Sequence, residues 1–221
     1  MSKDIVVVLG AGGIGQATAR RQGFGKTILP ADFNAEILQA ATEALRGQGY
    51  TVVPHPVDVA SRASVHALAQ TAAGYGWAMQ VVNTAGLSPN MAPPAKILEV
   101  DLLGVALVLE EFEQVVTPGS SGVVISSMAG YMPPPLPAEQ DHALAQTPVD
   151  ALLSLPFLQG DAVPSSRRPT ACRSEQTTCA YRQPASAGGR IERSFQEGET
   201  CDGLGWSACS VTAPNRSPSH E

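Results

Sequence analysis

The chain has 221 residues, of which 43% are hydrophobic and 15% are charged, so it is long enough for one globular domain with a sizeable core. Its net charge of -6 gives no electrostatic reason to expect nucleic acid or an anionic membrane as a partner. The apolar run at residues 5–9 is too short for a secretory signal or a bilayer span, so we expect a cytoplasmic protein.

Apolar runs alternate with helical stretches over the first 164 residues. Continuous β-branched runs are typical of strands buried on both faces of a parallel sheet. The alternation predicts an α/β fold with a doubly wound parallel sheet. Pro30 is awkward inside its strand because it removes a ladder donor, and Ser61 is the expected cap of the third helix. The predicted strands cover residues 5–9, 27–32, 50–54, 79–83 and 122–127, and the predicted helices cover residues 14–21, 35–46, 61–73 and 96–116.

The composition changes after the last of these elements. Residues 131–164 are rich in proline and contain two short helical candidates, at residues 138–145 and 149–155, which we interpret as a lid or a contact in a homo-oligomer. From residue 165 onward Ile, Leu and Val occur only once each, so this part of the chain can bury little core. We therefore expect a poorly ordered tail at residues 165–221, and a sheet that is incomplete at its C-terminal end.

A glycine-rich motif directly follows the first predicted strand and opens a helix. In this context glycine allows a sharp turn and a close approach to a pyrophosphate, while the helix N-terminus supplies unpaired N–H groups. The pattern is typical of the dinucleotide-binding Rossmann fold, so residues 1–164 are the predicted nucleotide-binding domain. The predicted phosphate contacts are Gly10, Gly12, Gly13, Ile14 and Gly15.

An acidic residue ends the second predicted strand. The carboxylate of Asp32 is placed to accept both ribose hydroxyls of NAD and would repel the 2'-phosphate of NADP. Arg20 and Arg21 could favour that phosphate, but on the first helix we interpret them as solvated surface. The sequence therefore favours NAD as the cofactor over NADP.

Three further segments carry a family resemblance. They are Asp58-Val59 after the third strand, Asn83-Thr84-Ala85-Gly86 after the fourth, and Ile125-Ser126-Ser127 at the end of the fifth. With the glycine motif they resemble the short-chain dehydrogenase/reductase family over about residues 4–131. The resemblance implies that Asp58 and Val59 contact the adenine, that Asn83, Ala85 and Gly86 lie beneath the cofactor, and that Ser127 is the catalytic serine. Asp101 stands where many members have an asparagine.

The resemblance also implies a reaction, the NAD-dependent interconversion of a secondary alcohol and a ketone. In the family a tyrosine, acidified by a lysine four residues later, exchanges a proton with the substrate oxygen. Lys96 is the last lysine of this chain, so no Tyr-x-x-x-Lys can follow Ser127. We expect the chain as written to be catalytically impaired.

A changed reading frame accounts for the tail. When the codons from Pro169 onward are read from their third base, they can spell Tyr-Ser-Leu-Ser-Lys followed by an amphipathic helix. We therefore hypothesise a frameshift near residues 165–168. The tail also holds all four cysteines, but their spacing is irregular and contains no Cys-x-x-Cys pair, so we predict neither a metal site nor a disulfide framework.

Two alternatives and a substrate class remain at this stage. The long gap between Ser127 and the shifted tyrosine resembles 3α-hydroxysteroid dehydrogenase/carbonyl reductases, which implies a bulky hydrophobic alcohol or carbonyl as the small-molecule substrate. The first alternative is a non-catalytic dinucleotide-binding or interaction module. The second is that the sheet folds poorly, because the later helix and strands of the family are missing from the written frame.

Overall fold

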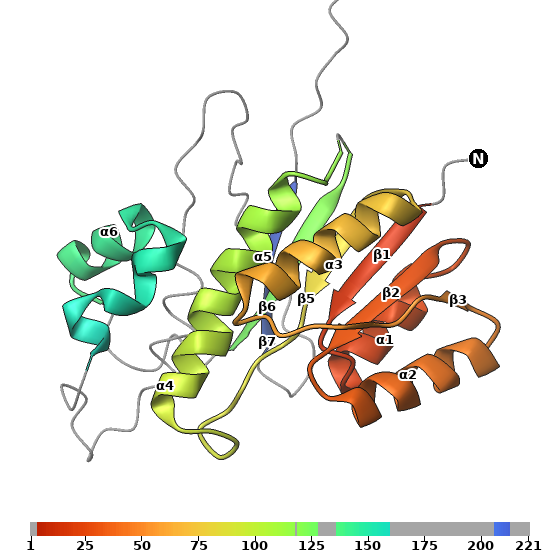
Figure 1. The fold of residues 1–221 in the computed structure, drawn as a ribbon, viewed down its shortest axis with the longest axis horizontal. Coiled ribbons are helices and arrows are strands. Elements are labelled where there is room, and N and C mark those ends of the chain that lie inside the picture. Colours follow the sequence, from red (N-terminus) through yellow and green to blue (C-terminus); the bar gives the residue numbers. More distant parts are fainter. Residues whose placement is uncertain (1–3, 118, 128–135, 160–205, 213–221) are drawn as a thin grey trace, which may run out of the picture.

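The computed structural model describes residues 4–117, 119–127, 136–159 and 206–212 (Figure 1). The strands are β1 (Asp4–Leu9), β2 (Thr27–Asp32), β3 (Thr51–Val52), β4 (His55–Pro56), β5 (Trp77–Asn83), β6 (Ser121–Ser127) and β7 (Trp206–Thr212). The helices are α1 (Gly13–Gln22), α2 (Ala35–Gly47), α3 (Arg62–Tyr75), α4 (Pro94–Ile97), the π-helical η1 (Leu98–Leu103), α5 (Gly104–Glu113), α6 (Ala138–Gln146), and the short η3 (Val149–Ser154) and η4 (Pro156–Leu158).

The strands form one sheet in the order β3-β2-β1-β5-β6-β7, with β4 also paired to β2. Every pairing among β1 to β6 is parallel, which confirms the predicted doubly wound sheet. The chain moves from β1 outward to β2 and β3, then crosses to the other side of β1 to add β5 and β6. The strand order therefore reverses between β1 and β5, and doubly wound proteins bind ligands at the carboxyl ends of the strands at such a point.

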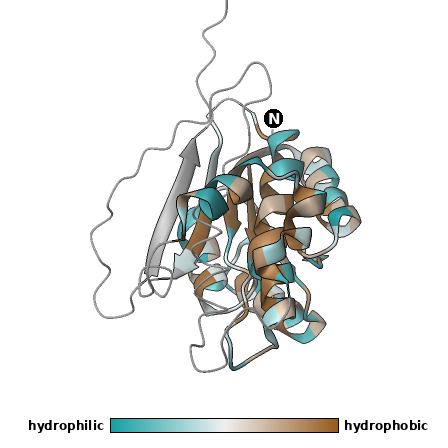
Figure 2. Ribbon diagram, turned by 90° about the vertical axis from the view of Figure 1, so that its left-hand side faces the viewer, coloured by the Kyte–Doolittle hydropathy of each residue, from teal (hydrophilic) through white to brown (hydrophobic). Residues whose placement is uncertain are grey.

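Strand β1 is buried on both faces, as its continuous apolar run predicts. Ile5, Val7 and Leu9 pack in the larger core cluster with α3 and α5, while Val6 and Val8 pack against α1 and α2. Figure 2 shows hydrophobic residues gathered along these central strands, between the helical layers. Because neighbouring side chains point to opposite faces, a run of this kind requires a helical layer on each side of the sheet.

The third predicted strand, residues 50–54, is shorter in the structure, where β3 covers only Thr51–Val52 and a separate strand, β4, follows at His55–Pro56. The Ile28 carbonyl accepts a hydrogen bond from the Val53 N–H at 2.9 Å, and the Asp32 carbonyl accepts one from the Val57 N–H at 3.0 Å. Pro30 lies midway between these acceptors and faces the same neighbour. Pro30 has no N–H to donate to this neighbour, so the ladder is interrupted between β3 and β4.

The long helix predicted at residues 96–116 begins at Pro94, ends at Glu113 and is interrupted by η1. Proline is favoured in the first turn because the N–H it lacks would have no partner there. The two short helices predicted at residues 138–145 and 149–155 correspond more closely to α6 and η3. Leu144 of α6, with Val149 and Leu152 of η3, is buried in the larger core cluster, so the segment packs onto the domain beside η1 and α5 (Figure 1).

An antiparallel strand at the sheet edge was not predicted. Strand β7 lies in the predicted tail and pairs with the whole of β6, from Ser121 opposite Thr212 to Ser127 opposite Trp206. The rest of the tail, with Cys172, Cys179 and Cys201, lies outside the described residues. Within the described ranges, no helix is long and apolar enough to cross a membrane, and no group of three metal-ligating side chains converges.

Candidate functional site

The glycine-rich motif forms a tight loop between β1 and α1 at the carboxyl edge of the sheet. Gly10 has φ +89, a conformation that favours glycine, and its N–H donates to the Ala31 carbonyl of β2 at 2.8 Å. A Cβ atom at Gly10 would lie 2.6 Å from Thr84 Oγ1, on the loop that follows β5. The loop is therefore held between the ends of β2 and β5, and glycine is required at its first position.

The other glycines of the loop differ in their surroundings. A Cβ at Gly12 or Gly13 would meet nothing within 4 Å, so the space beside these residues is open. A Cβ at Gly15 would lie 1.8 Å from the Gly10 carbonyl oxygen, so helix α1 can approach the loop only without a side chain there. Ile14, between them, is partly exposed. The first turn of α1 carries no acidic residue, which leaves its positive end available to an anion.

Asp32 ends β2 beside this loop. Its Oδ2 atom accepts a hydrogen bond from the Ala11 N–H at 2.7 Å, and its Oδ1 atom accepts one from the Asn34 N–H at 2.8 Å. These bonds fix the carboxylate against the glycine loop and leave each oxygen with further lone pairs. Arg20 is not directed at Asp32, since its guanidinium donates to Gln48 Oε1 at 2.9 Å and to Gln16 Oε1 at 3.3 Å.

The Asp58-Val59 pair lies in the loop between β4 and α3, and β4 pairs with the end of β2 that carries Asp32. The Asp58 carboxylate accepts a hydrogen bond from the Ala60 N–H at 2.9 Å, so it shapes the turn that leads into α3. Val59 is buried, and a Cβ at Gly104 would lie 2.9 Å from its Cγ2 atom. The small residue at the start of α5 therefore lets that helix pack closely over the loop of Val59.

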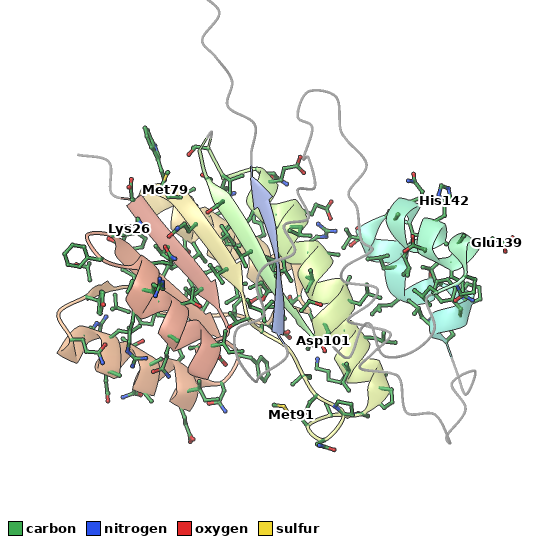
Figure 3. The ribbon with its side chains drawn as sticks, turned by 180° about the vertical axis from the view of Figure 1, so that it is seen from behind. Lys26, Met79, Met91, Asp101, Glu139 and His142 are labelled. Carbon is green, nitrogen blue, oxygen red and sulfur yellow. The ribbon has the colours of Figure 1, made fainter. Side chains whose placement is uncertain are left out.

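The segment Asn83-Thr84-Ala85-Gly86 continues from the end of β5. Asn83 is buried, and its Oδ1 atom accepts a hydrogen bond from the Ala85 N–H at 3.2 Å. A Cβ at Gly86 would lie 3.5 Å from Asp101 Oδ1, an atom that also accepts the Leu87 N–H at 2.8 Å. Asp101 belongs to the π-helical η1, and Figure 3 shows it near the end of the sheet opposite Lys26 and Met79. Such π-helical turns are frequent at functional sites.

The structure brings the glycine loop, Asp32 and the Asn83 segment together, because β1, β2 and β5 are neighbours. Ser127 ends β6, the next strand, and three residues before it Val124 pairs with Asn83. For Ser127 the structure describes only the backbone. Sequence reasoning missed the role of Thr84, whose hydroxyl reaches the glycine loop. The signal in the sequence was the position of Thr84 inside the Asn83-Thr84-Ala85-Gly86 motif.

Comparison with known proteins agrees with this geometry. A model of the short chain dehydrogenase family matches residues 3–138. A short-chain dehydrogenase/reductase named bsc3, from Alternaria brassicicola, is 39% identical over 160 residues, which cover 72% of this chain and 58% of that protein. The chain thus spans little more than half the length of this relative.

Solved structures show the same architecture. An actinorhodin polyketide ketoreductase, solved as a point variant with NADPH, is 26% identical, with a TM-score of 0.51 over 59% of this chain and 55% of that one. A metagenomic short-chain oxidoreductase in complex with NADP is 27% identical, with a TM-score of 0.51 over 60% of this chain and 66% of that one. Both likenesses cover a little more than half of the present chain.

Proposed function

Because the chain belongs to the short-chain dehydrogenase/reductase family, we propose that it binds NAD and that its inherited reaction is the interconversion of a secondary alcohol and a ketone. The observation that carries the proposal is the Asp32 carboxylate, fixed against the glycine loop by its bond from the Ala11 N–H. A dinucleotide needs two features side by side, a loop for the pyrophosphate and an acceptor for the ribose hydroxyls. The structure supports both at the carboxyl ends of neighbouring strands.

The choice of NAD over NADP rests on charge. The Asp32 carboxylate would lie close to a 2'-phosphate and repel it, whereas it can accept the free ribose hydroxyls of NAD. Arg20, one of the two arginines of α1 that could compensate, is engaged by Gln16 and Gln48. The two structures named above hold NADPH and NADP, so these relatives do not by themselves favour NAD.

The residues proposed to hold the cofactor divide by the part that they would contact. Gly10, Gly12, Gly13, Ile14 and Gly15 would contact the pyrophosphate and its surroundings, Asp32 the ribose, Asp58 and Val59 the adenine, and Asn83, Ala85 and Gly86 the underside of the cofactor. When bound, the cofactor supplies the hydride acceptor and donor of the reaction. Ser127 is the proposed residue that binds the substrate oxygen.

The written chain lacks the proton-transferring part of this site. No lysine follows Lys96, so the family's tyrosine-lysine pair is missing. We propose that a frameshift near residues 165–168 removed it. The family model matches residues 3–138 and none of residues 165–221, as this proposal requires. The proposed substrate remains a bulky hydrophobic alcohol or carbonyl, by the length of the segment after Ser127.

A second candidate function follows from the same missing residues. A chain that keeps the nucleotide site and lacks the tyrosine-lysine pair could act as a non-catalytic dinucleotide-binding module. The packing of α6 and η3 onto the domain gives such a module an additional surface. Turnover together with cofactor binding would favour the enzyme, whereas binding without turnover by a chain whose written frame is confirmed would favour the module.

The test is a titration of the full chain with NADH and with NADPH, followed by the fluorescence of the reduced nicotinamide. We expect NADH to bind at least about tenfold more tightly, which corresponds to about 1.4 kcal/mol of discrimination by one carboxylate. Asp32→Ala should remove most of this preference. Glu43→Ala, which removes an exposed carboxylate of α2, is the matched control and should leave both affinities unchanged. A folded wild-type chain that binds neither cofactor would contradict the proposal.

A further inference from the structure

The hydroxyl of Thr84 lies at the junction of β1, β5 and the glycine loop. Its Oγ1 atom is 2.9 Å from the Leu9 carbonyl oxygen and 2.9 Å from the Gly10 carbonyl oxygen. The N–H of Thr84 also donates to the Leu9 carbonyl, at 2.7 Å. The hydroxyl carries one proton, so it is shared between the two carbonyls and reaches one peptide further along the loop than the backbone bond does.

The backbone of Gly10 is consequently held by hydrogen bonds from both strands that neighbour β1. Its N–H donates to the Ala31 carbonyl on the β2 side, and its carbonyl accepts from Thr84 on the β5 side. Helix α1 packs against the same carbonyl through Gly15, with no room for a side chain between them. The next N–H, that of Ala11, donates to Asp32. The direction of the Gly10 carbonyl therefore sets where the following peptides of the loop point.

We propose that Thr84 is a positioning residue for the phosphate-binding loop, acting through its hydroxyl on the Gly10 carbonyl. The inference rests on the proposed function, because it assigns Thr84 a part in cofactor binding without any contact to the cofactor. Losing the hydroxyl removes this bond to the Gly10 carbonyl and loosens the position of that carbonyl, while the bonds to Ala31 and Asp32 remain. Only the part of the ligand that contacts the loop, the pyrophosphate, should be affected.

The experiment compares NADH with adenosine, which has no phosphate, as ligands of the full chain. Thr84→Ala should raise the Kd for NADH about five- to tenfold, the size expected for one intramolecular hydrogen bond, and should leave the Kd for adenosine within about twofold. Thr84→Ser, which restores the hydroxyl, should return NADH binding to within about twofold of wild type. Thr42→Ala is the matched control, because Thr42 has a buried hydroxyl that donates to the Leu38 carbonyl in α2.

The outcomes separate this inference from the function on which it rests. If wild type binds NADH and Thr84→Ala binds it equally well, the inference is overturned and the proposed function stands. An equal loss of NADH and adenosine affinity, unrescued by Thr84→Ser, would show a general structural role and also overturn it. If folded wild type does not bind NADH, the proposed function fails first and the inference fails with it.

Discussion

Gly12 and Gly15 lie three residues apart in the same motif, yet a side chain at each would meet different surroundings. A methyl group at Gly12 would project into open space. At Gly15 it would overlap the Gly10 carbonyl oxygen, so either the helix or the loop would have to move. Packing therefore requires glycine at position 15 but not at position 12, where the proposed reason for glycine is access of the ligand.

Substituting these glycines should separate stability from binding. We expect Gly15→Ala to lower the free energy of unfolding by about 2 kcal/mol, because an overpacked contact must be relieved by backbone movement. Gly12→Ala should leave the free energy of unfolding within about 0.5 kcal/mol of the wild-type value, since small changes that meet no neighbour are nearly neutral. This variant should nevertheless weaken NADH binding. Urea unfolding and NADH titration of both variants measure these effects, and equal destabilisation by both would contradict the packing argument.

An ion cluster joins three elements on the face of the molecule covered by α3 and α5. Arg62 of α3 donates to Glu111 of α5 at 2.6 Å, to Glu110 at 2.9 Å and to Asp150 of η3 at 3.0 Å. His66 Nδ1 lies 2.8 Å from the second oxygen of Glu111. The Glu111 side chain is only 5% exposed, whereas that of Asp150 is 80% exposed. Loss of Glu111 should therefore lower the stability of the fold more than loss of the other acidic residues of the cluster.

The pKa of Glu111 is lowered in the folded protein. Burial by itself would raise it, but hydrogen bonds from His66 and Arg62, together with their charges, outweigh the burial. The unfolded chain consequently binds a proton at Glu111 more readily than the folded chain does. The stability contributed by this carboxylate is present above its ordinary pKa of about 4.5 and is lost as the pH falls through the lower folded value.

Removing this charge should change both the size and the pH dependence of stability. Glu111→Gln should lower the free energy of unfolding at pH 7 by about 2 kcal/mol, the usual size for a buried hydrogen bond to a charged group. It should also flatten the fall in stability below about pH 4.5. Asp150→Asn, the exposed control, should cost less than about 1 kcal/mol. Unfolding curves between about pH 3 and pH 7 measure both, and identical pH profiles for wild type and Glu111→Gln would refute the assignment.

At the scale of the whole molecule, the sheet combines two kinds of sequence. Its strands from β1 to β6 come from the part that matches the family, while β7 comes from the tail and pairs antiparallel with β6. A parallel strand in this position would require a crossover connection, which is how doubly wound sheets are extended. The tail thus adds an antiparallel edge strand to an otherwise parallel sheet.

Restoring the frame near residues 165–168 should restore turnover. A full chain corrected there should oxidise a bulky secondary alcohol with NAD at least about a hundredfold faster than the written chain, because general acid-base catalysis contributes that much. Following NADH formation by absorbance measures the gain. Ser127→Ala in the corrected chain should remove most of it, whereas Glu43→Ala should not. A corrected chain that folds, binds NADH and remains inactive on a panel of such alcohols would contradict the frameshift proposal.

The sequence by itself determined the features that depend on local pattern. The apolar run of β1, the glycines that follow it, and Asp32 at the end of β2 could be assigned because their periodicity and spacing are read along the chain. The doubly wound order then follows from the alternation of strands and helices. For the same reason the absence of a tyrosine-lysine pair after Ser127 was visible without a structure.

Only the tertiary structure decided the features that join distant segments. The break between β3 and β4 opposite Pro30, the reach of Thr84 to Gly10, and the bond from Arg62 to Asp150 connect residues that lie far apart in the chain. No periodicity records such contacts, because they arise when strands from separate parts of the chain become neighbours in the sheet and helices pack over them. Pattern predicts most of the strands and helices, and packing decides which side chains then meet.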